Sequence, residues 1–417
     1  MTNSYKPSEL GPIPYDWEVV PIGAMKPFVT SGSRGWAEYY SEFGDAFIRI
    51  TNLSRDSIYM NLEDLRFVNL PKDDTEGNRT QLRENDVLVS ITADIGIIGY
   101  VASVFPRPAY INQHIALVRL DQTSTCPKFV AYFWAAKQAQ KRFRNLTDAG
   151  AKAGMSLMTV QKIPVALPPT KAEQEAIAEA LTDADALIES LEQLIAKKRL
   201  LKQGAMQELF RPNIGGVIKQ LREVSTLKGR IGWQGLKQTE FTQNADEPFL
   251  ITGMNFKDGE IRWSEVYHIS EERFQLAKEI QLETGDVLMT KDGTIGKILY
   301  IDKIPYPGKA SLNSHLLLFR PICESYHPKY LYYQLSTRRF ANFIELNKSG
   351  TTFFGISQAS VGNYPVVLPA MKDQVQIAAI LTDMDTEITA LEAKLAKARQ
   401  IKQGMMHNLL TGKIRLV

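Results

Sequence analysis

Two segments of this chain carry the same alternating spacing of apolar residues, four and then three positions apart. Such spacing places side chains along one narrow stripe of an α-helix, the seam of a coiled coil. Charged and polar residues fill the remaining faces. The pattern therefore predicts two long helices, each with a seam suited to one partner helix. The seam positions are Ile177, Leu181, Ala184, Ile188, Leu191 and Ile195 in the first segment, and Ile377, Leu381, Met384, Ile388, Leu391 and Leu395 in the second.

The first long helix has a clear predicted start. Thr170 and Glu173 have the spacing of a capping box and directly follow two prolines, whereas the second helix begins after Pro369 without a threonine. At 1.5 Å per residue, about 40 residues make a rod of roughly 60 Å. We expect the two rods to pair in antiparallel fashion, with a globular lobe at each end. The alternative is that each helix packs only on its own domain.

The two helices belong to a longer internal repeat. The segment 174–210 aligns without gaps on 374–410, and about half of the positions are identical. Upstream, Asp86-Val-Leu recurs as Asp286-Val-Leu, and Gly154-Met-Ser recurs as Gly355-Ile-Ser. Such a repeat indicates either a duplication without functional consequence or a protein whose target has two halves.

Each copy places a mixed segment before its long helix. β-Branched residues and glycine-containing turns predict buried strands there, and aromatic faces predict amphipathic helices. The strands are expected at 85–92, 115–120, 285–293 and 316–320, and the helices at 129–143 and 330–344. The predicted fold is α+β, with two repeated globular domains separated by two long antiparallel helices that form a coiled coil with approximate twofold symmetry. The expected boundaries are 1–168 and 212–368 for the domains, and 169–211 and 369–417 for the helices.

Composition limits the class of protein. Apolar residues make up 44% and charged residues 23%, as in ordinary soluble proteins. We find no apolar run long enough for a membrane span and no signal peptide, so we expect a cytoplasmic protein. The two cysteines, Cys126 and Cys323, exclude a disulfide framework. The net charge of +3 is too small to argue for nucleic acid by itself.

Motifs for catalysis are missing from the sequence. There is no Asn/Asp-Pro-Pro-aromatic motif of a DNA amino-methyltransferase and no Gly-x-Gly-x-x-Gly nucleotide loop. The segment 293–297 lacks the spacing of a phosphate-binding loop, and the five histidines lack metal-ligand spacing. His114 and His315 are equivalent in the repeat, but a lone histidine beside an apolar run is usually structural. We expect no catalytic residue, no metal and no cofactor bound by this chain.

Glycine-containing polar loops at matching positions of the two copies are the candidates for contact with nucleic acid. Glycine permits close approach of the backbone, and the polar side chains offer hydrogen bonds to phosphates and base edges. The two copies share the frame but differ in loop residues, as two readers of different half-sites require. The candidates are Ser33, Arg34, Trp36, Thr92, Asp94, Asn112, Gln113 and Lys152 in the first lobe, and Lys228, Arg230, Trp233, Lys291, Thr294, Lys297, Asn313, Lys348, Thr351 and Thr352 in the second.

The whole chain resembles the specificity subunit of type I restriction–modification systems. The resemblance is carried by Ile-Pro-Val-Ala-Leu-Pro-Pro-x-x-x-Glu-Gln-x-x-Ile at 163–177, by Gly-Asp-Val-Leu with a downstream Gly-x-Ile-Gly at 285–296, and by the ending that starts at Lys402-Gln-Gly. The second copy keeps part of the first motif. The first copy departs from the second motif, with Asn85 and Ala93 in place of glycine.

The resemblance implies a non-catalytic subunit that reads DNA. Each lobe would be a target recognition domain for one half of a bipartite site, and the paired helices would set the gap between the halves. Two modification subunits that bind S-adenosylmethionine and methylate adenine would dock on the helices, and ATP-dependent restriction subunits would join them. Two alternatives remain open: a self-contained methyltransferase, which the missing motifs disfavour, and a coiled-coil adaptor that does not read DNA.

Overall fold

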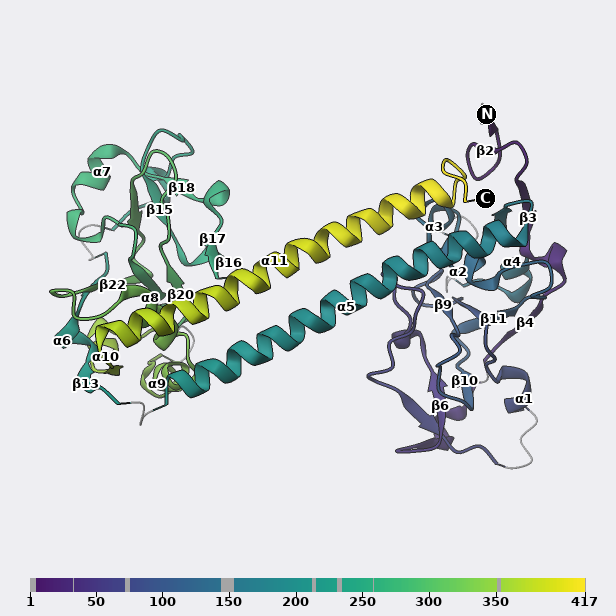
Figure 1. Ribbon diagram of the computed structural model, residues 1–417, viewed down its shortest axis with the longest axis horizontal. Helices are drawn as coiled ribbons and strands as arrows, with labels where there is room; N and C mark the ends of the chain where they lie inside the picture. Colours follow the sequence, from purple (N-terminus) through teal and green to yellow (C-terminus); the bar gives the residue numbers. More distant parts are fainter. Residues whose placement is uncertain are drawn as a thin grey trace. The chain divides into compact units, whose positions relative to one another are not determined.

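The computed structural model describes residues 5–32, 34–71, 76–143, 154–211, 215–230, 235–257, 259–350 and 354–416. Contacts divide the chain into two units. Unit 1 comprises Met1–Gln193 and Glu392–Val417, and unit 2 comprises Leu194–Leu391. The long helices α5 (Lys171–Leu209) and α11 (Met371–Leu409) are each continuous, and each contributes one part to each unit (Figure 1).

Two four-stranded sheets organise the described part of unit 1. The first is antiparallel, in the order β4 (Phe28–Ser31), β11 (Ile115–Arg119), β8 (Val87–Ser90), β9 (Ile98–Tyr100). The second has the order β10 (Ala109–Ile111), β6 (Asp45–Ile48), β7 (Arg66–Val68), β5 (Tyr40–Ser41), with β10 parallel to β6. The smaller pairs are β1 (Tyr5–Lys6) with β2 (Ile13–Pro14), and β3 (Glu18–Pro21) with β12 (Pro164–Leu167). The short helices are α1 (Glu76–Thr80), α2 (Pro127–Ala135), α3 (Lys137–Phe143) and α4 (Leu157–Gln161).

The first sheet is buried on both faces. Alternate residues of a strand point to opposite faces. Val87 and Val89 of β8 belong to the core that contains Trp134 of α2, whereas Leu88 belongs to the core that contains Ile48 of the second sheet. Burial on both faces explains why β8 reads in the sequence as a continuous apolar run.

Unit 2 repeats this plan. Its larger sheet has the order β14 (Ser225–Lys228), β22 (Leu316–Pro321), β19 (Val287–Thr290), β20 (Ile298–Tyr300), and its second sheet the order β18 (Tyr267–His268), β15 (Phe249–Ile251), β21 (Ala310–Leu312). The pairs are β13 (Val217–Gln220) with β23 (Pro365–Leu368), and β16 (Phe256–Lys257) with β17 (Glu260–Ile261). The short helices are α6 (Leu221–Val224), α7 (Glu271–Gln275), α8 (Pro328–Leu335), α9 (Arg338–Asn347) and α10 (Gln358–Gly362). The four predicted strands are confirmed as β8, β11, β19 and β22.

The two predicted amphipathic helices are each broken in two, so that part of the prediction is wrong. Ala136 has an extended backbone and separates α2 from α3. The break lets α3 turn so that Phe143 packs on Gly96, where an added Cβ would lie 3.0 Å from the Phe143 ring. In unit 2, Thr337 is extended in the same way between α8 and α9. The local apolar period is alike on both sides of each break, so it does not reveal the break.

The start of α5 confirms half of the predicted capping box. The hydroxyl of Thr170 accepts a hydrogen bond from the Glu173 backbone N–H, at 3.2 Å. The Glu173 carboxylate does not complete the box. It accepts from Arg415 Nη2 at 2.8 Å instead, and so holds the C-terminal tail on unit 1.

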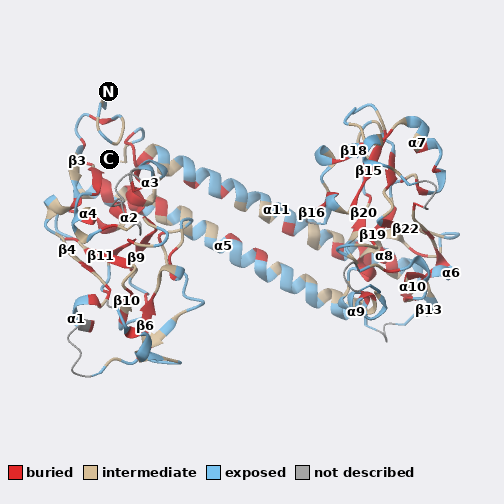
Figure 2. Ribbon diagram, turned by 180° about the vertical axis from the view of Figure 1, so that it is seen from behind, coloured by how far each residue is buried: buried red, intermediate tan, exposed pale blue. Residues whose placement is uncertain are grey.

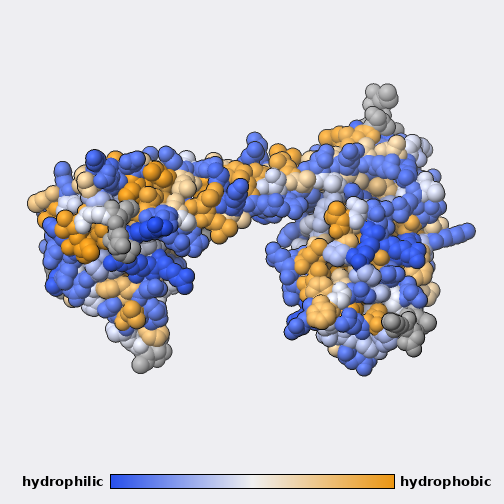
Figure 3. Space-filling model, turned by 60° about the horizontal axis from the view of Figure 1, so that its bottom comes forward, coloured by the Kyte–Doolittle hydropathy of each residue, from blue (hydrophilic) through white to orange (hydrophobic). Residues whose placement is uncertain are grey.

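The seam residues of both helices are buried or half-buried, whereas the other helix faces are mostly exposed (Figure 2). Near the start of α5, Ile177 and Leu181 lie in the same core as Trp134, and Leu409 from the end of α11 joins them. Unit 2 repeats the arrangement with Leu381 and the end of α5. Each helix therefore packs both on its own domain and on the other helix, so the predicted pairing is confirmed and packing on its own domain alone is excluded. Apolar side chains also reach the surface along the long helices (Figure 3).

A polar cluster sets the register of the helices in unit 1. The Asp185 carboxylate accepts from Tyr132 Oη at 2.7 Å, and its other oxygen lies 2.5 Å from Lys402 Nζ. Closer to the middle of the helices, Arg399 pairs with Glu192 at 2.6 Å. Residue numbers rise on α5 while they fall on α11, so the two segments run antiparallel within unit 1.

The same cluster recurs in unit 2 with the helices exchanged. Asp385 of α11 accepts from Tyr333 Oη at 2.8 Å and forms an ion pair with Lys202 of α5. Lys198 pairs with Glu387 at 2.6 Å. The repeated Lys-Gln-Gly motif therefore supplies the lysine of each cluster. The repeated Leu-Thr-Asp motif lies just before the aspartate of each cluster.

A second ion pair recurs in the two units, in the first sheet of unit 1 and in the larger sheet of unit 2. Arg119 on β11 donates to both carboxylate oxygens of the fully buried Asp86, at 2.7 Å each. Arg320 and Asp286 form the same pair in unit 2, at 2.9 and 2.8 Å. The hydrogen bonds that Arg320 donates to Asp286 raise the pKa of Arg320, so its guanidinium stays charged. The repeated Asp-Val-Leu motif is thus a structural anchor of the sheet.

Candidate nucleic-acid interface

One end of the large sheet in unit 1 gathers the predicted loops. Strands β4 and β8 both run antiparallel to β11, with Ser31 opposite Ala116 and Ser90 opposite Ile115. The last residues of β4 and β8 therefore meet the first residues of β11 at the same end. The loops that follow β4 and β8 and the loop that precedes β11 leave the sheet from this end.

Backbone contacts tie these loops together. Gly32 N–H donates to Ile115 O at 3.3 Å, and Ile91 N–H donates to His114 O at 2.9 Å. Thr92 hydrogen-bonds to the His114 ring and forms a bridge with Gly154. An added Cβ at Gly32 would lie 2.2 Å from Asn112 O, so only glycine permits this approach. Three predicted loops and the end of a fourth thus form one cluster.

Unit 2 builds the same loop cluster. Lys291 N–H donates to His315 O at 2.9 Å, and Lys291 O accepts from Ile356 N–H at 2.9 Å. His315 Nδ1 lies 3.2 Å from Asp292 Oδ2, which places the 291–297 and 313–315 loops side by side. An added Cβ at Gly229 would lie 3.1 Å from Leu316 O, so the backbone after β14 passes close to the start of β22.

The turn after β8 shows how the two copies depart from each other. Gly293 has φ of 71°, in the left-handed region that favours glycine, and its counterpart Ala93 has φ of 61°. The residues just before β19 and β8 form a corresponding pair, in which Gly285 has φ of 97° and Asn85 has φ of 70°. Asparagine tolerates this region, but alanine is strained there. The shared backbone shape therefore persists where the first copy lacks the glycine.

Several candidate side chains in these clusters are accessible. Thr294 and Lys297 are exposed in unit 2, and Lys291 and Asn313 are half-buried. Lys348 lies 2.5 Å from Glu345 and 4.6 Å above the centre of the Phe354 ring. Lys228 pairs with Glu279 at 2.9 Å. In unit 1, Arg34 is exposed, and Thr92 and Gln113 are half-buried.

Three candidates are buried in this structure. Trp36 is 4% exposed and packs against Phe47 and Tyr110, with ring centres 5.7 and 5.5 Å apart. Asn112 is 7% exposed, and its side chain accepts from the His114 backbone. In this structure both side chains make contacts inside the domain and support the loops.

Arg230 is the third buried candidate. It is 4% exposed and donates to Leu312 O at 2.8 Å and to Ser311 Oγ at 3.0 Å. Burial lowers the pKa of Arg230 to about 10, which leaves the guanidinium charged at neutral pH. Its role in this structure is to hold the 229–230 backbone against β21. The candidates Ser33, Lys152, Trp233, Thr351 and Thr352 lie outside the described residues.

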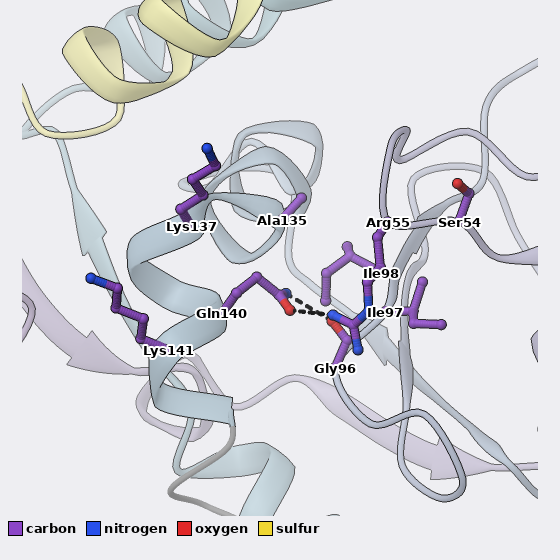
Figure 4. A pocket seen from close by; sticks show the side chains of 9 residues that line it. All are labelled: Ser54, Arg55, Gly96, Ile97, Ile98, Ala135, Lys137, Gln140 and Lys141. Carbon is purple, nitrogen blue, oxygen red and sulfur yellow. Dashed lines mark hydrogen bonds between the residues drawn. The ribbon is translucent and has the colours of Figure 1, made fainter. Parts of the chain in front are cut away.

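Arginines that sequence reasoning missed hold the unit 1 cluster in place. Arg79 of α1 donates to Ser31 O at 2.8 Å. Arg55 pairs with Asp94, donates to Ile95 O at 3.0 Å and donates to Gln140 Oε1 at 2.8 Å (Figure 4). The candidate Asp94 is thus held by an arginine of its own domain. Arg55 lies in a loop and Arg79 in a short helix, and neither belongs to a spacing pattern in the sequence that would predict its role.

A cavity of about 390 Å³ lies beside Arg55. Its lining includes Gly96 from the turn between β8 and β9, Ile98 from β9, and Lys137 and Lys141 from α3 (Figure 4). Both lysines are exposed. The cavity therefore adds positive charge next to the Thr92–Gly96 loop, on the side where α3 begins.

The described residues contain no group of three or more His, Cys, Asp or Glu residues that could hold a metal ion. Nor do they contain a helix long and apolar enough to cross a membrane.

Known proteins share the repeated architecture. Residues 16–197 and 217–402 each match the family described as Type I restriction modification DNA specificity domain. The specificity subunit of the type I restriction enzyme MjaVIII from Methanocaldococcus jannaschii is 25% identical, over 97% of this chain and 94% of that protein. The putative MjaX specificity subunit from the same organism is 22% identical, over 99% of this chain and 97% of that protein.

Solved structures show the same fold. The S subunit of a type I restriction–modification system from M. genitalium has a TM-score of 0.60 at 15% identity, over 94% of this chain and 96% of that chain. A chain solved in work on complex assembly and conformational transition of the type I R-M system has a TM-score of 0.57 at 16% identity. The match covers 96% of this chain and 99% of that chain.

Proposed function

Because this chain belongs to the family of type I restriction–modification DNA specificity proteins, with two copies of the family domain, we propose that it reads a bipartite DNA site through its two loop clusters and performs no chemistry itself. One observation carries the proposal. The same loop cluster is built twice, on sheets with equivalent strand order and with equivalent backbone hydrogen bonds from Ile91 to His114 and from Lys291 to His315, while the accessible loop residues differ.

The accessible loop residues have the chemistry for DNA contact. Lysines and arginines bind phosphates, and hydroxyl and amide side chains read base edges in the major groove. Lys291, Thr294 and Lys297 supply such groups in unit 2, and Arg34 and Gln113 do so in unit 1. Since the two sets differ, we propose that the two halves of the site have different sequences.

The paired helices serve as spacer and scaffold in this proposal. Each has 39 residues, which corresponds to about 58 Å of helix. The Tyr–Asp–Lys clusters in both units tie each helix to its own domain and to the other helix, which favours a rigid spacer. Modification subunits that methylate adenine are the partners we propose for this scaffold, with restriction subunits joining them.

Methylation mapping of the host genome tests the proposal. We expect a split motif with modified adenine in each half, and we expect its methylation to disappear when this gene is deleted and to return with the intact gene. Complementation with a Thr294→Ala, Lys297→Ala variant should relax the motif in one half only. A map that is unchanged by the deletion, in cells that express the modification subunit, would contradict the proposal.

A further inference from the structure

The turn after β8 and its counterpart after β19 hold one exposed residue in the same place. In unit 1, the Ser90 hydroxyl donates to the Asp94 carbonyl oxygen at 2.5 Å and accepts from Ile97 N–H at 2.8 Å. In unit 2, the Thr290 hydroxyl donates to the Thr294 carbonyl oxygen in the same way. Asp94 and Thr294 are both exposed. The two loop clusters therefore present residues 94 and 294 from equivalent points of the backbone.

The side chains at this shared position differ in their hydrogen-bond chemistry. The hydroxyl of Thr294 can donate and accept, whereas the ionised carboxylate of Asp94 can only accept. A carboxylate at a surface that binds DNA also needs a compensating positive charge, because the phosphates repel it. The position is therefore informative only if the structure compensates the charge of Asp94.

Arg55 supplies this compensation. Its Nε donates to Asp94 Oδ2 at 3.3 Å, and its Nη2 donates to the other carboxylate oxygen and to Ile95 O, the latter at 3.0 Å. Its Nη1 donates to Gln140 Oε1 at 2.8 Å (Figure 4). These contacts occupy most N–H groups of the guanidinium. Arg55 therefore holds the loop in place and is not itself suited to read a base.

Asp94 stays accessible while it is paired. Its side chain is 61% exposed, and each carboxylate oxygen has more than one lone pair to accept with. Lys137 and Lys141 are exposed and line the cavity beside Arg55, so three cationic side chains surround one carboxylate. The surroundings are thus positive, as an approaching duplex requires, and Asp94 is an acceptor within them.

We propose that Asp94 selects cytosine or adenine over guanine or thymine at one position of the half-site read by unit 1, with Arg55 as its positioning residue. This inference rests on the proposed function and names the chemistry read at that position. In the major groove, cytosine N4 and adenine N6 donate hydrogen bonds, whereas guanine O6 and thymine O4 accept them. A carboxylate binds the first two groups and repels the other two.

Methylation of synthetic duplexes tests the proposal. The full chain is combined with the modification subunit of the same system, and each position of the half read by unit 1 is given each of the four bases in turn. That half is the one left unchanged by the Thr294→Ala, Lys297→Ala variant. We expect Asp94→Asn to lower the discrimination against guanine or thymine by about tenfold or more at one position that holds cytosine or adenine, because an amide can also donate. The other positions should keep their preferences.

Asp121→Asn is the matched control. Asp121 is an exposed aspartate just beyond the end of β11 that lies opposite the loop cluster, so its replacement should change no position. Unchanged discrimination in Asp94→Asn, or a change in the other half, would overturn the proposal. Loss of methylation of the cognate duplex would also overturn it, since asparagine can accept the same hydrogen bond. An unaltered chain that confers no split motif would instead overturn the proposed function, so the two failures are distinguishable.

A second measurement concerns Arg55. Arg55→Gln leaves the Asp94 charge without compensation, so affinity for the cognate duplex should fall about fivefold at low salt and less at high salt. Discrimination at the position should persist, and Arg55→Lys should bind nearly as the unaltered chain does. Adding Asp94→Asn to Arg55→Gln should recover the affinity and relax the position. A double variant that binds no better than Arg55→Gln would contradict the positioning role.

Discussion

Lys402 and Lys202 occupy equivalent places in the two Tyr–Asp–Lys clusters but differ in burial. The side chains of Lys402 and Asp185 are 10% and 12% exposed, whereas those of Lys202 and Asp385 are 21% and 37% exposed. Removing one partner of a buried ion pair costs about 3–5 kcal/mol, because a charge is left without compensation. Exposed pairs contribute only about 0–1 kcal/mol. The same substitution should therefore have different costs in the two units.

Replacement of either lysine by methionine keeps most of the stem and removes the charge. We expect Lys402→Met to lower the free energy of opening of unit 1 by about 3 kcal/mol, because Asp185 keeps only the Tyr132 hydroxyl as a partner. We expect Lys202→Met to lower that of unit 2 by about 1 kcal/mol, since water reaches Asp385.

Hydrogen exchange monitored by mass spectrometry reports the opening of each unit separately. Lys397→Met is the control, because Lys397 is exposed and forms no ion pair with another described residue. Adding Asp185→Asn to Lys402→Met should restore part of the stability, since the uncompensated charge is removed. Equal losses in the two units, or no recovery in the double variant, would refute this reasoning.

Three further predictions concern the turn, the spacer and the loops. Ala93→Gly should raise the stability of unit 1 by about 1 kcal/mol, measured by chemical denaturation, because it removes the strain at φ of 61°; a loss of stability would contradict this. Inserting one heptad into both α5 and α11 should lengthen the gap of the methylated motif by about three base pairs, since seven residues add about 10 Å; an unchanged gap in the methylation map would disprove the spacer. Exchanging residues 348–353 for another sequence should alter only one half of the motif, and a change in both halves would contradict the assignment of that loop.

Periodic features of this protein could be predicted from the sequence. The seam spacing predicts both long helices, and the apolar runs around Val87 and Val287 predict buried strands. These features depend on residues close together in the chain, because side-chain period is a local property of helix and strand. The internal repeat predicts two domains, since motifs that recur in the same order over a long stretch of sequence imply that the two copies share a fold.

Burial and polar partners could not be predicted in the same way. Trp36 and Arg230 stand in glycine-containing loops, yet both are buried by segments distant in the chain. The reach of Lys402 to Asp185 depends on the antiparallel register of two helices that lie far apart in sequence. Loop composition alone therefore overestimated the accessible candidates.

The sequence by itself determined the two long helices, the duplicated α+β plan and the family, because each follows from local period or from repeated order. The tertiary structure decided which loop residues remain accessible, where Ala136 and Thr337 break the predicted helices, and which partners the repeated aspartates take. Those outcomes depend on contacts between segments far apart in the chain, and the spacing of residues within one segment carries no information about them.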